Sequence, residues 1–149
     1  MKYLITFIIL IFFVPSLAGT ADDYMKSGYS LLNQKKYNEA FDDFEKAVKI
    51  DPVYVDAWLG RGVCLYYLGK SDEALSSFDR AISINPNDDM AWYTKGYVLF
   101  NLGIYHKSIL CFDRTLEINP DDDYAKKYRR KAAENLFKCK CSDCNKNKQ

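Results

Sequence analysis

The strongest constraint on the fold is a short phrase that recurs three times at a fixed interval. The phrases are IDPVYVDAW, INPNDDMAW and INPDDDYAK, and they begin at Ile50, Ile84 and Ile118, each 34 residues after the one before. A fixed period of about 20 to 50 residues is typical of proteins built by stacking one structural unit on the next. The chain is therefore predicted to be an array of repeated units.

Six further sets of residues keep the same interval, with no insertion between copies. They are Tyr24, Trp58 and Trp92; Gly28, Gly62 and Gly96; Ala40, Ala74 and Ser108; Phe44, Phe78 and Phe112; Ala47, Ala81 and Thr115; and Pro52, Pro86 and Pro120. Each set is called a column below. Seven columns in step define three units, at residues 21–54, 55–88 and 89–122.

Each unit is predicted to be a helix, a turn and a second helix. In the second unit, two stripes of apolar residues at helical spacing are separated by Gly69 and closed by Pro86. The stripes are Trp58, Leu65 and Leu68, then Leu75, Phe78, Ala81 and Ile82. Glycine inside a helix costs roughly 1 kcal/mol against alanine, so a repeated Gly62 column predicts a close approach by a neighbouring helix. The small-residue column at Ala74 is expected to supply the other side of that approach.

This order of aromatic, glycine, alanine, aromatic, alanine and proline residues resembles the tetratricopeptide repeat family. The resemblance extends over residues 21–122 and implies an all-α fold, a right-handed α–α superhelix (a solenoid) of three helix–turn–helix repeats. One column departs from the family, because the leucine that commonly precedes the glycine is replaced by Ser27, Arg61 and Lys95. One helix pair cannot bury its apolar face alone, so three stacked pairs are the minimum and the array needs a cap.

Residues 123–138 are predicted to form the C-terminal capping helix. Apolar residues recur there every four positions, as Tyr124, Tyr128, Ala132 and Leu136. The tryptophan column now holds Lys126 and the glycine column holds Arg130, so one face is polar. Asn87 or Asp88 is expected to cap the third unit's first helix, and one of Asp121–Asp123 to cap the last helix.

In the tetratricopeptide repeat family, the first helices of successive repeats line a concave groove that binds peptides or partner helices. Carried over column by column, the resemblance implies a groove that is largely apolar and aromatic. Its predicted members are Met25, Tyr29, Leu32 and Asn33; Leu59, Val63, Tyr66 and Tyr67; and Tyr93, Tyr97, Phe100 and Asn101. Large aromatic side chains suit partner binding because they bury much area at modest entropic cost. The competing interpretation is that these side chains pack partly on the next helix.

The resemblance does not extend to one activity of the family. Some members grip the C-terminal carboxylates of chaperones through a clamp of lysine and asparagine side chains. The corresponding columns here carry Met25 and Tyr29, so chaperone binding of that kind is not expected.

Residues 1–18 are predicted to lie outside the array, as a signal peptide or an N-terminal membrane anchor. Lys2 precedes an unbroken apolar run from Tyr3 to Val14, and small residues around Ala18 follow. This order is typical of a secretory signal, and the run is short for a membrane span, which needs roughly 20 apolar residues. Cleavage after Ala18 and retention as an anchor both stay open. Either way, the array is expected to be secreted or extracytoplasmic, and an uncleaved segment would associate it with a membrane.

Basic residues are concentrated at the C-terminal end. The formal net charge of the whole chain is +1, yet residues 124–149 carry nine basic and two acidic side chains. One interpretation is a solvated helix face followed by a soluble tail. The other is attraction to an acidic partner or an anionic membrane surface. Nucleic acid is not an expected partner.

The tail, residues 139–149, suggests an alternative function. Cys139, Cys141 and Cys144 lie in the motif CKCSDC. Three thiolates at this spacing are candidate ligands for a metal site, although structural zinc usually takes four ligands. Outside the cytoplasm, two of them would tend to form a disulfide and leave one thiol for a cross-link to another chain. The remaining interpretation is that the three cysteines have no specific role. A protein that works through thiol or metal chemistry in this tail is therefore the alternative to an interaction scaffold.

No catalytic motif is present, so the protein is predicted not to be an enzyme and to need no cofactor. Cys64 and Cys111 fall on apolar stripes and are predicted to be packing residues. His106, the only histidine, is expected on the surface. The sequence Gly60-Arg61-Gly62 lies inside a repeat helix and lacks the strand that a nucleotide-binding loop requires. The favoured function is a non-enzymatic protein–protein interaction scaffold, exported or membrane-tethered, that binds a peptide or helix in the aromatic groove.

Overall fold

A computed structural model describes the backbone of residues 19–146 and the side chains of residues 19–138. All of its elements are helices: α2 (Ala21–Asn33), α3 (Tyr37–Ile50), α4 (Val55–Tyr67), α5 (Ser71–Ile84), α6 (Asp89–Asn101), α7 (Tyr105–Ile118) and α8 (Asp123–Lys146). None of the helices in this part of the chain is both long enough and apolar enough to cross a membrane. The predicted signal peptide or anchor, residues 1–18, lies outside the described residues, and so do the side chains of the CKCSDC motif.

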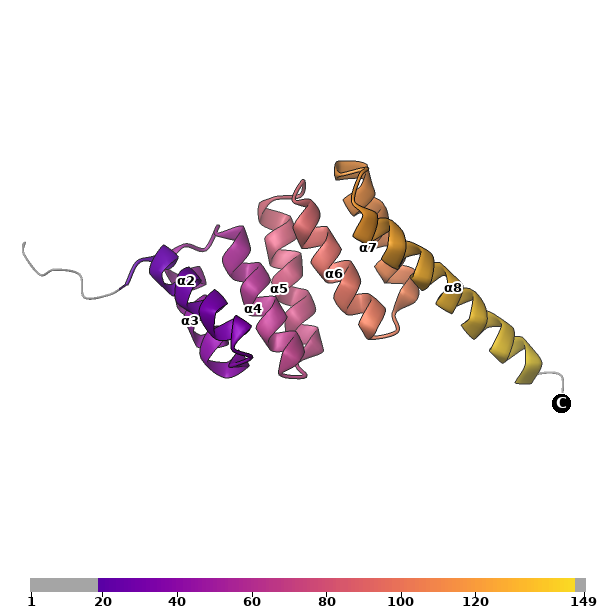
Figure 1. Ribbon diagram of the computed structural model, residues 1–149, viewed down its shortest axis with the longest axis horizontal. Coiled ribbons are helices and arrows are strands. Elements are labelled where there is room, and N and C mark those ends of the chain that lie inside the picture. The colour runs from indigo at the N-terminus through magenta and orange to yellow at the C-terminus, as the bar shows by residue number, and fades with distance from the viewer. Residues whose placement is uncertain (1–18, 147–149) are drawn as a thin grey trace, which may run out of the picture.

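The helices form three antiparallel pairs that stack in chain order, and α8 packs at the end of the stack (Figure 1). The pairs are α2 with α3, α4 with α5, and α6 with α7, and each second helix also packs on the first helix of the next pair. The predicted all-α array of three helix–turn–helix units with a C-terminal capping helix is confirmed.

The turn inside each pair requires one residue with left-handed backbone geometry. Gly69 has φ 79° and Gly103 has φ 75°, while the same position in the first pair is Lys35, with φ 60°. Glycine adopts this geometry without steric cost because it has no Cβ, whereas lysine does not. The first pair therefore closes on a less favourable residue than the other two.

The recurring phrase fixes the junction between pairs. The indole Nε1 of Trp58 donates to the carbonyl of Pro52 at 3.0 Å, and Trp92 donates in the same way to Pro86 at 2.9 Å. Each tryptophan thus ties the start of a first helix to the loop that precedes it. Lys126 replaces the tryptophan at the start of α8, where it pairs instead with Asp123 at 3.5 Å.

Helix caps complete these junctions. The Asp88 carboxylate accepts from the backbone N–H of Ala91 at 2.9 Å, and Asp122 accepts from Ala125 at the same distance. Of the predicted cap acceptors, Asp88 and Asp122 are therefore the ones that act. At the N-terminal end, Thr20 and Asp23 form a capping box for α2.

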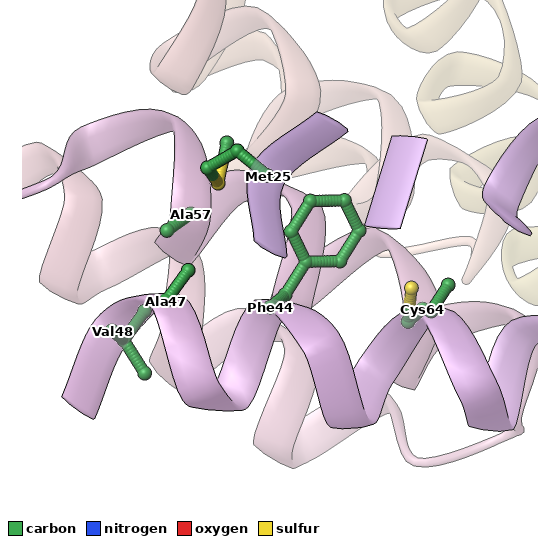
Figure 2. Packing of buried hydrophobic residues seen from close by; sticks show 7 residues of the cluster. Met25, Phe44, Ala47, Val48, Ala57 and Cys64 are labelled. Atoms are coloured by element: carbon green, nitrogen blue, oxygen red, sulfur yellow. The ribbon is translucent and has the colours of Figure 1, made fainter. Parts of the chain in front are cut away.

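The core of each pair is built around a phenylalanine. Phe44, Phe78 and Phe112 are all 0% exposed, and Figure 2 shows Phe44 among Met25, Ala47, Ala57 and Cys64. Each ring lies on a second helix that packs between the first helix of its own pair and the next helix of the row, α4, α6 or α8.

The same rings explain the glycine column and correct the prediction for it. A Cβ added to Gly62 would lie 2.5 Å from Cε1 of Phe78, so the glycine faces an aromatic ring and not the small residue Ala74. The predicted small-residue column does contribute in the third pair, where Ser108 Oγ donates to the carbonyl of Gly96 at 2.8 Å. Close approach was the right expectation, and the approaching group is an aromatic ring.

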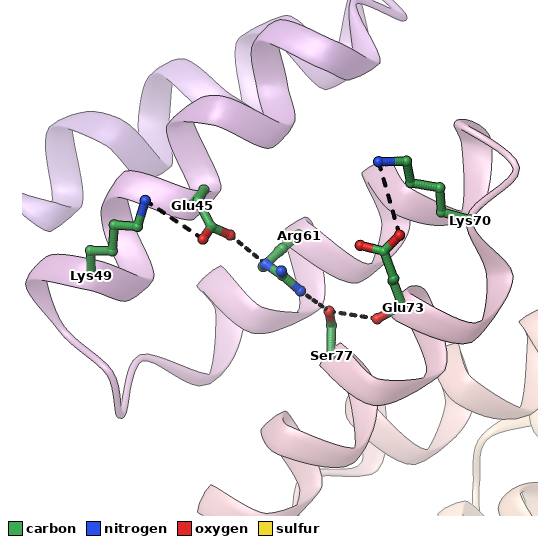
Figure 3. A network of polar contacts seen from close by, with 6 residues as sticks. All are labelled: Glu45, Lys49, Arg61, Lys70, Glu73 and Ser77. Atoms are coloured by element: carbon green, nitrogen blue, oxygen red, sulfur yellow. Dashed lines mark hydrogen bonds and ion pairs between the residues drawn. The ribbon is translucent and has the colours of Figure 1, made fainter.

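The column that departs from the family holds the junctions together electrostatically. Arg61 on α4 donates through Nε to Glu45 of α3 at 2.5 Å and through its terminal nitrogen to Ser77 of α5 at 2.5 Å (Figure 3). Lys95 on α6 pairs with Asp79 of α5 in the same way. Arg129 on α8 pairs with Asp113 of α7. A basic residue replaces the common leucine because an acidic residue of the preceding second helix faces it at every junction.

The capping helix differs from its prediction in two respects. It continues to Lys146 beyond the predicted end at residue 138, since no glycine or proline follows to interrupt it. Its packed face is made by Ala125 and Ala132, both 0% exposed, with Tyr128 between them. Tyr124 was predicted on that face, but it is 67% exposed.

Candidate functional site: an aromatic face on the first helices

The first helices of the three pairs and the capping helix form one row. α2 contacts α4, α4 contacts α6, and α6 contacts α8. The helix starts repeat every 34 residues along the sequence, at Ala21, Val55, Asp89 and Asp123, so equivalent positions on the four helices point in equivalent directions. The predicted groove residues belong to this row.

Ten of the twelve predicted groove residues keep accessible surface. Tyr29 and Tyr67 are 43% and 55% exposed, and Asn33 and Asn101 are exposed as well. The partly buried members are Leu32, Val63, Tyr66, Tyr93, Tyr97 and Phe100. These ten residues are called the groove face below.

Met25 and Leu59 do not belong to this face. They are 4% and 7% exposed, which leaves them almost no surface to offer a partner. Met25 packs in the core cluster around Phe44, and Leu59 packs in the cluster around Phe78. The prediction for these two residues is corrected, because each side chain packs into the core of its own helix pair and not onto the accessible face.

At the N-terminal end, Tyr29 lies edge-on against the core. Its ring centroid is 5.2 Å from that of Phe44, with the ring planes at 78°. Burial, followed by the nearby charge of Asp56, raises the pKa of Tyr29 to about 12. Tyr29 therefore stays neutral at physiological pH and presents an aromatic surface with a polar tip.

In the middle, Tyr67 is stacked on Tyr37 of α3, with ring centroids 4.6 Å apart and planes at 11°. The neighbouring Tyr66 ring lies 5.3 Å away. Partial burial, then Tyr37 and Tyr97, raises the pKa of Tyr67. Tyr67 is held by its stack, yet more than half of its surface remains free.

At the C-terminal end, the capping helix completes the face through Tyr128. Its ring lies edge-on to Tyr97 at 5.1 Å and to Phe100 at 5.5 Å. Burial, followed by Tyr128, raises the pKa of Tyr93 to about 12. The sequence assigned Tyr128 only to the cap. Continuing the repeat columns one unit further would have placed α8 in the row.

The charges around the face differ between its two ends. Lys127 Nζ and Lys131 Nζ lie 5.9 Å and 5.5 Å from the centre of the Tyr128 ring. Neither ammonium group has a carboxylate within 4.0 Å among the residues whose side chains are described. At the other end, Asp22 accepts a hydrogen bond from Tyr54 at 3.0 Å. The α8 end of the groove face thus carries two lysines without a carboxylate partner among the described side chains, whereas Asp22 lies in the first turn of α2.

The remaining candidate groups are packing or surface residues. Cys64 and Cys111 are 0% and 4% exposed, which confirms their predicted packing role. Burial raises the pKa of Cys64 to about 12 and that of Cys111 to about 11, so both thiols are protonated at neutral pH. His106 is exposed in the first turn of α7, as predicted. Over residues 19–138, no three histidine, cysteine or carboxylate side chains converge on a point that could hold a metal.

Comparison with known proteins agrees with this architecture. Family models described as tetratricopeptide repeat match residues 21–52, 55–88 and 90–122. No curated protein matches the chain. Solved structures do match, and three of them illustrate the range of similarity.

The first is the first TPR of Spaghetti (RPAP3) bound to the HSP90 peptide SRMEEVD, which is 25% identical, with a TM-score of 0.75 over 79% of this chain and 94% of that one. The NMR structure of the first TPR domain of human RPAP3 is 25% identical, with a TM-score of 0.78 over 83% and 97%. The complex of the TPR2B domain of yeast Sti1 with an Hsp70 peptide is 18% identical, with a TM-score of 0.71 over 76% and 96%, and supports the fold alone.

Proposed function

Because the chain belongs to the tetratricopeptide repeat family, we propose that it is a non-enzymatic protein-interaction scaffold that binds a peptide or a partner's helix on the groove face. Similar domains have been solved with a bound peptide, among them the RPAP3 domain with its HSP90 peptide. Such domains support a binding role for the fold, and the residues of the face define what this chain binds.

The observation that carries the proposal is a row of aromatic side chains that the fold holds in place but leaves accessible. Tyr67 is stacked on Tyr37 and yet 55% exposed, and Tyr29 lies against Phe44 and yet is 43% exposed. Side chains that are already ordered lose little entropy on binding, and tyrosine is enriched among residues that dominate binding energy. The face is therefore suited to anchor apolar side chains of a peptide.

The positive charges at α8 indicate that the bound peptide carries an acidic residue. Lys127 and Lys131 flank the Tyr128 ring without carboxylate partners among the described residues. An acidic side chain on the peptide would pair with these two lysines, while an adjacent residue of the peptide contacts the rings of Tyr97, Phe100 and Tyr128. The lysine and asparagine clamp of chaperone-binding relatives is absent, so the acidic group is expected at α8 and not at Met25 and Tyr29.

The cellular location remains part of the proposal. The order of charges and apolar residues in residues 1–18 supports export, with either cleavage after Ala18 or an uncleaved anchor. Mass spectrometry of the protein purified from its source would decide between them. A mature N-terminus at Gly19 indicates cleavage, a chain beginning at Met1 in a membrane fraction indicates an anchor, and full-length protein in the cytoplasm rejects export.

Peptide display on the full chain tests the binding function. Random peptides are selected on the wild-type protein, and the affinity of selected peptides is measured by fluorescence anisotropy. Changing Tyr29 and Tyr67 to Ala should weaken binding roughly tenfold or more, because both are exposed anchors of the face. Circular dichroism should show unchanged helicity, since neither residue is part of the buried core.

Phe137→Ala is the matched control. Phe137 is 70% exposed and lies on α8 outside the groove face, so its removal takes away an aromatic of similar exposure. Binding should be unaffected. Equal loss in the control and in the tyrosine variant, or no selected peptide at all, would count against the proposed function.

A further inference from the structure

A pocket of about 400 Å³ opens between α5, α6 and α7. Its apolar walls are Leu75, Trp92, Leu99, Ile104, Leu110 and Cys111. On α6, the pocket uses Trp92, Lys95 and Leu99, whereas the groove face uses Tyr93, Tyr97, Phe100 and Asn101. No residue belongs to both, so the pocket is separate from the proposed peptide site.

The repeat provides an internal reference for what should fill this space. At the junction of the first and second units, the ring of Phe41 occupies the corresponding place, with the Arg61 guanidinium over it at 5.4 Å. At the junction of the second and third units, the same columns hold Leu75 and Lys95. Both replacements shorten or narrow the side chain, and α5 packs on α6 less extensively than α3 packs on α4. The smaller Leu75 therefore fills only part of the space that a phenylalanine ring fills at the preceding junction, and it lines the pocket that remains.

The rim of the pocket is also more apolar than its counterpart. The columns that carry Lys70, Ser76 and Ser77 at the first junction carry Ile104, Leu110 and Cys111 at the second. Ile104 is 39% exposed and Leu110 is 56% exposed, so both offer apolar surface to the solvent. Exposed apolar side chains gathered around a hollow typically mark an interaction site.

We propose that this pocket is a second docking site, which takes one aromatic side chain from a partner polypeptide. The aromatic ring would take the position that the Phe41 ring takes in the preceding unit. It would lie between Trp92 and the cationic side chain of Lys95. A lysine ammonium over an aromatic ring contributes further attraction, which an aliphatic occupant would not gain. The rest of the partner would rest on Ile104 and Leu110 at the rim.

The test compares peptides selected on the full-length wild-type protein with their binding to a variant whose pocket is filled. The filling residue is the phenylalanine that stands at the equivalent position, Phe41, in the first unit. Leu75→Phe places in the second junction the side chain that the first junction already accommodates. Clones that bind wild-type protein, fail to bind Leu75→Phe and still bind the Tyr29→Ala/Tyr67→Ala variant are sequenced. An aromatic residue common to these clones is the expected result, with affinity for Leu75→Phe lower by on the order of tenfold. Leu75→Met, which conserves volume, should retain them.

A second variant keeps the test independent of core packing. Ile104→Lys with Leu110→Ser copies the first junction's rim at two exposed positions, so the fold is preserved and the same clones should bind more weakly. The inference is overturned if no clones depend on Leu75, if the dependent clones share no aromatic residue, or if the rim variant binds them as well as wild type does. Self-association that disappears in Leu75→Phe would assign the pocket to a second copy of the chain and overturn it too. Loss of groove-binding clones alone would leave this inference standing.

Discussion

At the scale of single residues, Lys35 carries a conformational cost that its counterparts avoid. Its φ of 60° places it in the left-handed region, which Gly69 and Gly103 occupy in the other two pairs. Left-handed geometry brings a Cβ close to the following carbonyl oxygen, at a cost of roughly 1–2 kcal/mol for most residues. The first pair carries this cost although α2 and α3 pack no more extensively than the helices of the other two pairs.

Lys35→Gly should therefore stabilise the protein. The gain is expected to be about 0.5–1 kcal/mol, since relief of the strained backbone is partly offset by the greater freedom of glycine in the unfolded chain. Chemical denaturation gives the change in the free energy of unfolding. Gln34→Gly is the matched control, because Gln34 has an ordinary φ of −82° and its replacement should destabilise. A destabilising Lys35→Gly would contradict the account of this turn.

In the glycine column, by contrast, replacing a glycine is predicted to destabilise the protein. Gly62→Ala should destabilise by roughly 1–3 kcal/mol, although alanine favours helices, because the new methyl group overlaps the buried ring of Phe78. Gly28→Ala is the comparison: its Cβ would lie 3.0 Å from the Phe44 ring, so a smaller cost is expected. Thermal unfolding of both variants measures the order. A more costly Gly28→Ala would show that the ring does not set the column.

At the scale of elements, the junctions between helix pairs are joined by a repeated ion pair. Arg61, Lys95 and Arg129 occupy one column on α4, α6 and α8, and each pairs with an acidic residue of the preceding second helix. The Arg61 and Glu45 side chains are only 19% and 28% exposed, whereas Asp79 at the next junction is 60% exposed. Water screens the second pair more strongly, so the first junction gains more from its pair.

A double-mutant cycle measures this difference. Arg61→Ala and Glu45→Ala should show a coupling energy of about 1 kcal/mol, and Lys95→Ala with Asp79→Ala a smaller one, as is usual for exposed pairs. Urea denaturation of the four variants in each cycle provides both values. Equal couplings, or a larger value at the Lys95 junction, would contradict the ranking by burial.

The helices and their contacts show which features of the fold could be predicted from the sequence and which could not. The period of 34 residues predicted the helix pairs, and the break in its columns at Lys126 and Arg130 predicted the capping helix. The family resemblance implied the twelve groove residues, of which ten keep accessible surface. The sequence did not predict that Met25 and Leu59 are buried, since their column also holds Tyr93, which is only partly buried. The role of Tyr128 depends on the angle at which α8 packs, and the partner of Arg61 depends on a helix from the preceding unit. Neither follows from spacing within one unit.

At the scale of the whole molecule, burial of weakly acidic groups links stability to alkaline pH. Burial raises the pKa of Cys64 from 9.0 to about 12, and burial raises the pKa of Tyr93 from 10.0 to about 12. Between these values, the unfolded chain has lost protons that the folded chain still holds. The free energy of unfolding therefore falls as pH rises, and the contribution of these groups is complete only below about pH 9.

Cys64→Ala should make the alkaline loss of stability less steep. Urea denaturation at about pH 8 and about pH 10 gives the decrease in each protein, and the variant should lose less because one buried thiol no longer favours the protonated, folded state. The variant will be less stable at both pH values, so the comparison uses the difference between them. An identical decrease in both proteins would show that burial of the Cys64 thiol does not contribute.

The central claim is that the molecule binds its partner on the row of first helices, and site-specific photo-crosslinking tests it most directly. A benzophenone side chain is introduced in place of Tyr67, on the groove face, and in a separate protein in place of Phe137, an exposed aromatic of α8 away from that face. Each protein is irradiated with the same selected peptide, and the products are mapped by mass spectrometry. Crosslinking at position 67 with little at position 137 is the predicted result. Crosslinking at position 137 and none at position 67 would contradict the claim.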